Sequence, residues 1–577
     1  MKDTISNIKF VWRYAKDEKW RFVIFTIISI IQIFVSVISP VLSAKIIVSL
    51  TSEEYKQIIY LAIAIMLIQL ARAFLDYISQ MVTYKMHRNA LAKAEVDLGR
   101  EVLKLSNESI DTHGTGLFIQ RITNDTSRIT DIFGFLLSIF SSITRDIGIY
   151  IAVFILNKTI FVYLFIVSFI SFLIEKLRAN KRNEEDKKSR KQREKVSGFI
   201  GEMVRGQHDI KVLNSEENFI DELDTKITDA FRLEYGMRSV GARYRFYTSV
   251  FDEISGYVTI ALLVFLIYIG RIEAATALIL YNYSNNAYGF AFKLGNLMEQ
   301  LKDFNLSCNR VKEVFDGKEF KKEKFGKETI KNVKGNIEFD NVEFYYKEEK
   351  KVLKDISFKI KANETVAFVG KSGSGKTTIF NLICKIYDPV SGTIKLDGKD
   401  LSTLTKDTIR SNITVITQDP YIFHMTIKDN IKIVKEGLTD EEMIKYAKLA
   451  CFDDFVQTLP DGYDTMIGEG GVNLSGGEKQ RLAITRALVQ ESKIILFDEA
   501  TSSLDNATQA KIQEAIDNLK NDYTILIIAH RLSTVINADR ILFIENGKIK
   551  VEGTHKELLS KSPEYKSLYE REIKSNN

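Results

Sequence analysis

The chain has 577 residues, which is too long for a single hydrophobic core, so at least two domains are expected. Its net charge of +5 is small for this length and gives no case for nucleic acid as a partner. The three cysteines have no metal-ligand spacing and the six histidines form no cluster, so neither residue type indicates a metal site.

Long apolar runs crowd the first half of the chain and predict an all-α transmembrane domain over residues 1–318. Residues 22–48 are apolar apart from Lys45 and are long enough to cross a bilayer. Residues 159–174 are equally apolar, and four runs interrupted by polar side chains bring the number of spans to six. The expected spans are at about residues 20–49, 58–84, 131–156, 158–177, 246–270 and 274–298.

Six spans place both chain ends on the same side of the membrane. The run 176–195 contains ten Lys or Arg residues, which places that side in the cytosol. The inner loops, about residues 86–130 and 178–245, are long and compatible with helices, so the spans are expected to continue as helices well into the cytosol. Usage rich in Lys, Ile and Asn favours a bacterium of low genomic GC content, and hence its plasma membrane.

Charged side chains inside spans are expensive, so they are candidates for function. Asp252 and Glu253 have no basic neighbour within their span, and the last span carries a polar run over residues 281–288. One hypothesis is that these groups line a cavity that favours cationic or amphipathic cargo. The alternative is that they hydrogen-bond between helices.

Residues 319–336 are charged and punctuated by glycine, and they are interpreted as a linker. The alternating strands and helices of residues 337–577 predict an α/β domain. An apolar strand at 366–369 runs into a glycine-rich turn and then a helix, which is the P-loop pattern in its required context. Lys376 is placed to reach the β- and γ-phosphates, and the Thr377 hydroxyl to ligate Mg²⁺.

A second apolar strand ends in two carboxylates, Asp498 and Glu499. Beside a P-loop, Asp498 is suited to hold Mg²⁺ through water and Glu499 to orient or deprotonate the attacking water. Ser475 stands as a natural N-cap before a further helix, which gives a second helix N-terminus suited to phosphate. The plainer alternatives are an ordinary acidic strand end and a simple helix cap.

Two more polar residues follow apolar strands. His530 comes after the run 523–529 and is suited to hydrogen-bond a γ-phosphate, while Gln418 follows residues 413–417 and is suited to sense Mg²⁺ or the attacking water. Taken alone, each is equally compatible with a structural residue at a strand end.

With these pieces in order, nearly the whole chain resembles a half-size ATP-binding cassette exporter. Residues 370–378 resemble the Walker A motif, residues 494–498 Walker B, and residues 474–478 the family signature. Glu499 corresponds to the catalytic glutamate. Gln418 resembles the Q-loop, residues 502–505 the D-loop, His530 the switch histidine, and Tyr346 the aromatic residue that stacks on adenine.

The resemblance implies ATP and Mg²⁺ as ligands and a head-to-tail dimer, in which each ATP lies between one copy's Walker A motif and the other copy's signature. It implies catalytic roles for Lys376, Gln418, Glu499 and His530, and a magnesium site at Thr377, Gln418 and Asp498. The implied nucleotide contacts are Tyr346, Gly370, Ser372, Gly373, Gly375, Lys376, Thr377, Thr378, Ser475, Gly476, Gly477, Glu478 and Asp505.

Two polar segments, residues 116–125 and 206–217, resemble the family's intracellular loops, whose coupling helices dock on the nucleotide-binding domains. The intact Glu499 and signature glycines favour a homodimer, and the competent half of a heterodimer stays open. One departure is Glu478, where the family most often has glutamine.

The expected function is therefore ATP-driven efflux, with an ATP-gated channel or membrane regulator as the alternative. The predicted spans argue against a soluble ATPase acting on nucleic acid. Cavity polarity does not choose among lipids, peptides, drugs and metal conjugates as cargo.

Overall fold

The computed structural model describes residues 2–51, 55–287, 289–346, 351–468, 471–498, 510, 513–514, 516–517, 519–520, 522–529 and 535–576. The chain divides into two compact units, which are described separately. The first comprises Met1–Leu103 and Gly114–Phe320, and the second comprises Lys104–His113 and Lys321–Asn577.

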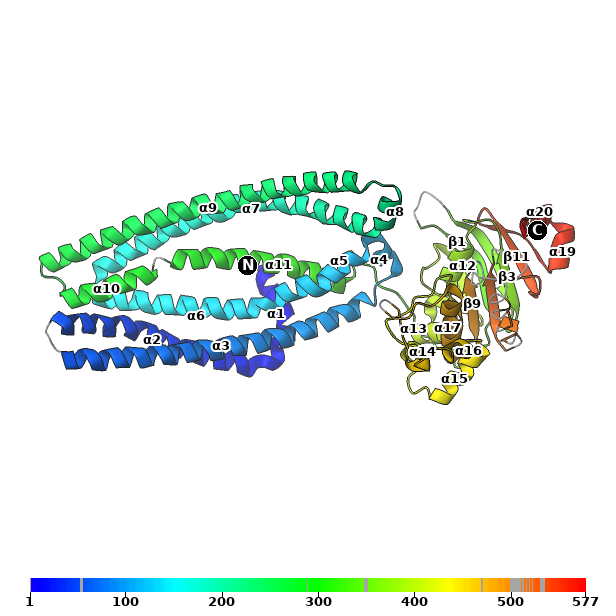
Figure 1. The fold of residues 1–577 in the computed structure, drawn as a ribbon, viewed down its shortest axis with the longest axis horizontal. Coiled ribbons are helices and arrows are strands. Elements are labelled where there is room, and N and C mark those ends of the chain that lie inside the picture. Colours follow the sequence, from blue (N-terminus) through cyan, green and yellow to red (C-terminus); the bar gives the residue numbers. More distant parts are fainter. Residues whose placement is uncertain are drawn as a thin grey trace. The chain divides into compact units, whose positions relative to one another are not determined.

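The first unit is helical. In Figure 1, α2 lies beside α3 and α7 lies beside α9 along most of their lengths. The helices are α1 (Lys2–Ala15), α2 (Lys19–Thr51), α3 (Tyr55–Val102), α5 (Thr115–Gln120), α6 (Thr126–Leu156), α7 (Lys158–Arg205), α8 (Gln207–Val212), α9 (Glu216–Tyr268), α10 (Ala274–Ala287) and α11 (Phe290–Asp316).

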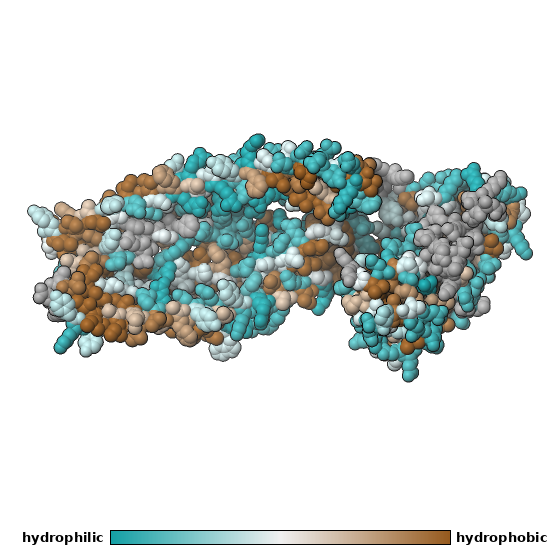
Figure 2. All heavy atoms as spheres, in the orientation of Figure 1, coloured by the Kyte–Doolittle hydropathy of each residue, from teal (hydrophilic) through white to brown (hydrophobic). Residues whose placement is uncertain are grey.

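Among the described residues, five helical stretches are long and apolar enough to cross a membrane. They lie within Asp3–Ile47, Tyr55–Val102, Thr115–Leu156, Lys158–Arg205 and Glu216–Tyr268. Their apolar side chains turn outward, as a lipid environment requires and water does not favour. Figure 2 shows hydrophobic residues gathered over α2 and α3, where Ile59, Met66, Leu67, Leu70 and Phe74 are exposed.

The longest helices exceed the thickness of a bilayer. Helix α3 has 48 residues, which at about 1.5 Å per residue is roughly twice the hydrocarbon core of about 30 Å. Helices α7 and α9 have 48 and 53 residues. These helices therefore extend well beyond a membrane, as the polar inner loops predict.

The predicted span 274–298 is not one helix. Helix α10 ends at Ala287, and α11 begins at Phe290 with Gly289 as its N-cap residue. Glycine has no side chain to pack and has a large entropy to lose inside a helix, so an interruption is favoured there. Helix α10 has 14 residues, fewer than the roughly 20 that a bilayer span needs.

The second unit contains two large sheets and a short pair of strands. The four-stranded sheet is antiparallel with the order β2-β1-β4-β5, and the six-stranded sheet has the order β12-β11-β3-β10-β9-β6. The strands are β1 (Ile337–Phe344), β2 (Leu353–Ile360), β3 (Thr365–Val369), β4 (Ser391–Leu396), β5 (Lys399–Asp400), β6 (Ile413–Ile416), β7 (Met425–Thr426), β8 (Met466–Ile467), β9 (Ile494–Asp498), β10 (Thr524–Ile528), β11 (Arg540–Glu545) and β12 (Lys548–Gly553).

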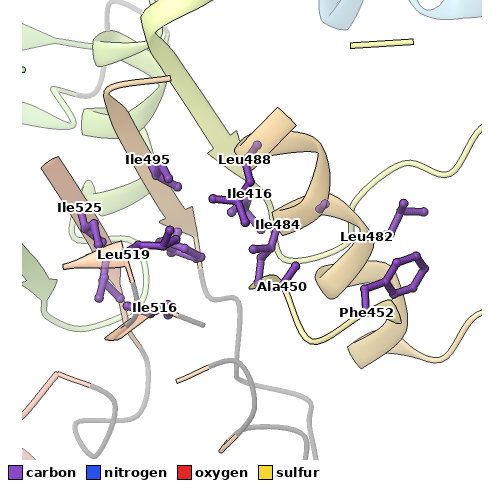
Figure 3. Close-up of a cluster of buried hydrophobic side chains, with 14 of the residues drawn as sticks. Ile416, Ala450, Phe452, Leu482, Ile484, Leu488, Ile495, Ile516, Leu519 and Ile525 are labelled. Carbon is purple, nitrogen blue, oxygen red and sulfur yellow. The ribbon is translucent and has the colours of Figure 1, made fainter. Parts of the chain in front are cut away.

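The helices of this unit are mostly short. They are α4 (Asn107–His113), α12 (Lys376–Ile383), α13 (Lys406–Asn412), α14 (Ile427–Lys432), α15 (Asp440–Leu449), α16 (Asp453–Val456), α17 (Gly476–Val489), α19 (His555–Lys561) and α20 (Pro563–Asn576). Figure 3 shows how α17 is held against the sheet: Ile484 and Leu488 pack beside Ile416 of β6.

Five strands of the larger sheet are parallel, and β12 alone is antiparallel to its neighbour. Strands β3 and β10 are buried along their whole length because their side chains are apolar on both faces. The carboxyl ends of β3, β6, β9 and β10 therefore meet at one edge of the sheet. In such sheets, ligands bind at this edge.

The two compact units divide the chain differently from the predicted domains at two places. Residues 104–113 fall within the predicted transmembrane domain 1–318, but they pack with the second unit. Most of the predicted linker 319–336 belongs to the second unit, which resumes at Lys321, and Gly326 N–H donates to the Leu404 carbonyl at 2.8 Å. Backbone hydrogen bonds hold both segments to the second unit. The charge and glycine content of the sequence, from which the linker was predicted, carry no information about such contacts.

Candidate functional site

The turn between β3 and α12 forms a cradle of backbone groups. Gly375 has φ of +106° and caps α12, and a Cβ there would lie 2.6 Å from Leu353 Cδ2. A Cβ on Gly370 would lie 2.1 Å from the Ile544 carbonyl oxygen. Neither position accepts a side chain, so the glycines let the backbone turn tightly enough for its N–H groups to face a phosphate.

The side chains of the turn converge on the same place. Lys376 is 5% exposed, and its ammonium donates to the carbonyls of Gly370 at 2.8 Å and Lys371 at 3.1 Å. Ser372 and Gly373 are exposed at the tip of the turn. Among the described residues, the buried hydroxyl of Ser374 has no hydrogen-bond partner. This hydroxyl suits a phosphate oxygen, and the sequence interpretation did not include it.

A magnesium position lies beside the cradle. The exposed Thr377 hydroxyl donates to Asp498 Oδ1 at 3.5 Å, so a hydroxyl and a carboxylate from two elements meet at the sheet edge. The described residues contain no group of three His, Cys, Asp or Glu side chains that would hold a metal alone. These residues fit Mg²⁺, which keeps several waters and is held by one or two protein oxygens together with substrate phosphates.

Tyr346 contacts the first turn of α12. Its hydroxyl is 3.2 Å from Thr378 Oγ1, and its side chain is among the exposed large hydrophobic groups at 48%. An exposed aromatic face beside the first turn of a P-loop helix is suited to stack on a nucleotide base. The predicted residues Tyr346, Thr377, Thr378 and Asp498 are thus grouped around α12.

The signature residues form a separate, capped helix start. Ser475 is the N-cap of α17, and its hydroxyl accepts from the Glu478 N–H at 3.4 Å. The Glu478 carboxylate in turn accepts from the Ser475 N–H at 2.7 Å, which completes a capping box. Ser475 and Gly476 are exposed, whereas Gly477 is buried. The Glu478 carboxylate thus caps the helix, and its predicted contact with nucleotide stays a prediction.

The segment that follows β6 is tied to α17. The Gln480 amide donates to the Gln418 carbonyl at 3.3 Å, and Lys479 forms an ion pair with Asp419 at 3.3 Å. Arg486 donates to the Tyr421 carbonyl at 2.9 Å. Direct hydrogen bonds and an ion pair therefore connect the segment that begins at Gln418 to α17.

Three predicted residues, Glu499, Asp505 and His530, lie outside the described residues. Glu499 directly follows the last residue of β9, and His530 comes two residues after the end of β10. The sheet order places β10 between β3 and β9, so β10 ends beside the P-loop strand and β9 ends one strand further along the same edge.

Two family models match the chain. One, described as the ABC transporter transmembrane region, matches residues 22–279, and the other, described as ABC transporter, matches residues 353–502. A Staphylococcus aureus protein (strain NCTC 8325 / PS 47), named for multidrug export as an ATP-binding/permease protein, is 33% identical over 573 residues. The match covers 97% of this chain and 99% of that protein. The chain belongs to the ABC transporter family.

Further relatives agree with this assignment. The similarly named protein of S. aureus strain bovine RF122 / ET3-1 is 33% identical over 574 residues, covering 97% of this ABC transporter and 99% of the relative. A solved structure titled as a bacterial Atm1-family ABC exporter with ATP bound has a TM-score of 0.83. It is 23% identical and covers 96% of this chain and 99% of its own, which shows the shared fold.

The predicted activity is confirmed at this level. The ABC transporter is a half-size exporter, in which a helical transmembrane domain and an ATPase domain share one chain. It is a multi-pass membrane protein with a cytosolic ATPase domain, and it couples ATP hydrolysis to efflux.

The membrane unit contains an apolar cavity of about 670 Å³ among α6, α7 and α11. Its aromatic lining was not anticipated from the sequence, and it consists of Tyr150, Phe154, Phe161, Phe165, Phe169, Phe172 and Phe290. The Tyr150 and Ser168 hydroxyls are hydrogen-bonded to each other at its wall. Asp252 and Glu253 do not line it, and Asp252 accepts from the Ser171 hydroxyl at 3.4 Å.

Proposed function

We propose that the exporter works as a homodimer, in which each ATP is held between the P-loop of one copy and the start of α17 in the other. The observation that carries this proposal is the exposed N-terminus of α17 at Ser475 and Gly476. A helix of 14 residues presents a partial positive charge at that end, which attracts phosphate. The P-loop of the chain already provides one helix start for the phosphates of one ATP. A second helix start suited to phosphate has a use if it binds the ATP held by the P-loop of another copy.

In this scheme, Lys376, the backbone of residues 370–375 and the Ser374 hydroxyl bind the triphosphate of ATP. Thr377 and Asp498 hold Mg²⁺, with Gln418 at the same edge. When bound, Mg²⁺ neutralises charge that develops on the phosphates during transfer. Tyr346 stacks on adenine, and its position is fixed by the contact with Thr378.

Glu499 is the proposed base that aligns and deprotonates the attacking water, because it follows Asp498 at the edge of the sheet. His530 is proposed to bind the γ-phosphate from the end of β10, and Asp505 to contact the nucleotide from the partner copy. Binding of two ATP molecules draws the two ATPase domains together, and hydrolysis releases them.

The proposed cargo is an apolar or aromatic compound that enters the cavity among α6, α7 and α11. This cavity offers aromatic faces and almost no polar group, so it favours compounds that leave water readily. The relatives' naming for multidrug export agrees with such a cargo. Asp252 and Glu253, which the sequence suggested for cationic cargo, are not part of this proposal.

The shared site can be tested by placing two lesions on different copies. Lys376→Ala removes the P-loop ammonium, and Ser475→Trp blocks the start of α17. A dimer with one lesion on each copy keeps one complete site if the sites are shared, because one P-loop and the opposite α17 are both intact. We expect such dimers, purified through two different tags, to hydrolyse ATP.

The matched control places both lesions on one copy and pairs it with an unmodified copy. Shared sites are then both incomplete, so hydrolysis is lost. Sites built within a single copy give the reverse result, and that result would contradict the proposal.

A further inference from the structure

The exposed face of α3 changes from apolar to basic near residue 84. Met81 and Tyr84 are exposed within the predicted span 58–84, at its cytosolic end. Lys85 and Arg88 follow directly after the span and are exposed as well. Because lipid tails require apolar side chains and the cytosolic surface favours Lys and Arg, this change marks the inner surface of the bilayer.

The chain that enters α2 shows the same change. Lys16 and Lys19 are exposed before the span, whereas Val23 is exposed within it. Trp20 stands between the two groups and is 77% exposed. Tryptophan and tyrosine gather at membrane interfaces because their rings are apolar and their polar atoms stay in contact with water. Trp20 and Tyr84 therefore mark the boundary on two helices that lie side by side (Figure 1).

Side-chain contacts hold the chain before α2 against α3. Lys93 forms an ion pair with Asp17 at 2.6 Å. The Asn89 side-chain amide donates to Glu18 Oε1 at 2.8 Å. The Arg88 guanidinium donates to the Asn89 side-chain oxygen at 3.1 Å, so Arg88 lies beside the same contact. The exposed cations of the two segments therefore belong to one surface.

This basic surface, which comprises residues 16–21 and 85–93, has an excess of positive charge. The two segments contain six Lys or Arg residues and two acidic residues. Both acidic residues already form ion pairs, with Lys93 and with Arg21. These two pairs leave four further cations in the two segments, which are Lys16, Lys19, Lys85 and Arg88.

A groove of about 610 Å³ adjoins the basic surface between α1 and α3. Ala92 of α3 lines it together with Lys93 and Arg100. Asp97 also lines the groove, but it is paired with Arg13 at 3.1 Å and so adds no net charge. Further along α3 than the exposed rings, there is thus room for a polar headgroup beside cations.

We propose that the basic surface binds an anionic phospholipid of the inner leaflet. Lys16, Lys19 and Arg88 attract its headgroup phosphate, and the groove accommodates the rest of the headgroup. Its acyl chains pack on the exposed apolar side chains of α2 and α3. An anionic lipid carries a negative headgroup and apolar chains in one molecule, which matches the boundary where basic and apolar side chains meet. A soluble phosphate would reach the same cations, so the test separates the two sources.

The test uses the fluorescence of Trp20. The chain has two tryptophans, Trp12 and Trp20, so Trp12→Phe leaves a single one. This full-length protein is reconstituted in phosphatidylcholine vesicles that contain a small, equal fraction of brominated phosphatidylglycerol or brominated phosphatidylcholine. Bromine on the acyl chains quenches a tryptophan that the lipid contacts. We expect phosphatidylglycerol to be preferred by about fivefold or more, since one Lys or Arg near the surface contributes about fivefold.

The variants are made in the Trp12→Phe background. Lys19→Gln/Arg88→Gln keeps the exposed rings and removes two cations, so we expect the preference for phosphatidylglycerol to be lost. Lys181→Gln/Lys187→Gln is the matched control, because it removes two exposed cations from the cytosolic part of α7. We expect the full preference in this control. Inorganic phosphate, compared with sodium chloride at equal ionic strength, is expected to leave the preference unchanged.

Equal quenching by the two lipids before the lysines and arginine are changed would overturn the proposal, and so would a full preference in Lys19→Gln/Arg88→Gln. Loss of the preference in the α7 control would overturn it in favour of general surface charge. Loss with inorganic phosphate would overturn it in favour of a site for soluble anions. Absence of quenching by both lipids would also contradict it, because protein would then cover Trp20. These readouts need neither hydrolysis nor a shared nucleotide site, so they are independent of the proposed function.

Discussion

The P-loop helix and the signature helix both begin beside glycines, yet they begin in opposite ways. Helix α12 starts at a left-handed Gly375 with no side-chain cap among the described residues, and its first residue, Lys376, is buried. Helix α17 starts at the exposed Ser475 with a complete capping box. The first turn of α12 is thus open to a ligand, whereas α17 satisfies part of its own start.

Their supports differ as well. Helix α12 follows β3, which is buried between β10 and β11 in the middle of the larger sheet. Helix α17 is joined to the segment after β6 by side chains that bond to the Gln418 and Tyr421 carbonyls. In the proposed dimer, this difference suits α12 to hold the nucleotide and leaves the start of α17 accessible to the nucleotide of the other copy.

The largest expected effect comes from a substitution that removes the proposed catalytic base and leaves the starts of α12 and α17 unchanged. Glu499→Gln is expected to lower steady-state phosphate release by about 10²–10⁴-fold, the range for losing a general base, while ATP binding persists. Phosphate release and ATP binding are measured on the same preparation. Glu491→Gln is the control, since Glu491 is an exposed carboxylate of the same unit. Unchanged hydrolysis in Glu499→Gln would show that another group acts as the base.

A second prediction tests the open start of α12. Gly375→Ala places a Cβ at φ of +106° and 2.6 Å from Leu353 Cδ2, so we expect ATP affinity to fall about tenfold or more. Gly437→Ala also has a positive φ, +79°, but its Cβ meets open space. That control is expected to lose stability and to keep ATP affinity, as measured by equilibrium binding. Equal affinity in both variants would contradict the comparison.

The residues of the P-loop, β9 and α17 were predictable from the sequence because each motif is a short contiguous pattern. The spacing from Gly370 to Lys376 sets the turn, and the apolar run before Asp498 sets the strand that carries it. Periodicity also predicted the long helices, because lipid-facing residues are apolar over more than twenty positions.

Long-range contacts were beyond such patterns. The hydrogen bond from Tyr387 to Asp111 joins residues that are 276 apart in the chain. Neither residue belongs to a sequence motif that would have singled it out. The position of Tyr387 before β4 depends on the register of β1 with β4, which no local motif encodes. The break between α10 and α11 was missed because residues 274–298 are helix-compatible on both sides of Gly289.

The sequence around Glu478 contains a capping-box pattern that the sequence analysis did not use. Ser475 and Glu478 form the S-x-x-E pattern of a capping box, which the structure confirms by hydrogen bonds in both directions. The resemblance assigned Glu478 to the nucleotide instead. The hydrogen bonds show the capping role, and the contact with nucleotide stays a prediction.

The smallest expected effect concerns this carboxylate. In the proposed dimer, the Glu478 charge lies one turn from the phosphates, where it opposes their binding. Glu478→Gln keeps an oxygen that accepts from the Ser475 N–H and removes the charge. We expect the KM for ATP to fall about twofold to fivefold, which corresponds to about 0.4–1 kcal/mol. We expect stability to drop by a few tenths of a kcal/mol, because the helix dipole loses a favourable charge.

The control for this prediction is Glu442→Gln in α15. Glu442 forms the same capping box with Thr439, so it separates the cost of changing a cap from an effect on the nucleotide. Steady-state kinetics should show a lower KM only for Glu478→Gln, whereas thermal unfolding should show a similar small loss in both variants. An unchanged KM in Glu478→Gln would mean that the start of α17 lies away from the phosphates. The proposal that this helix start binds the nucleotide of the other copy would then be contradicted.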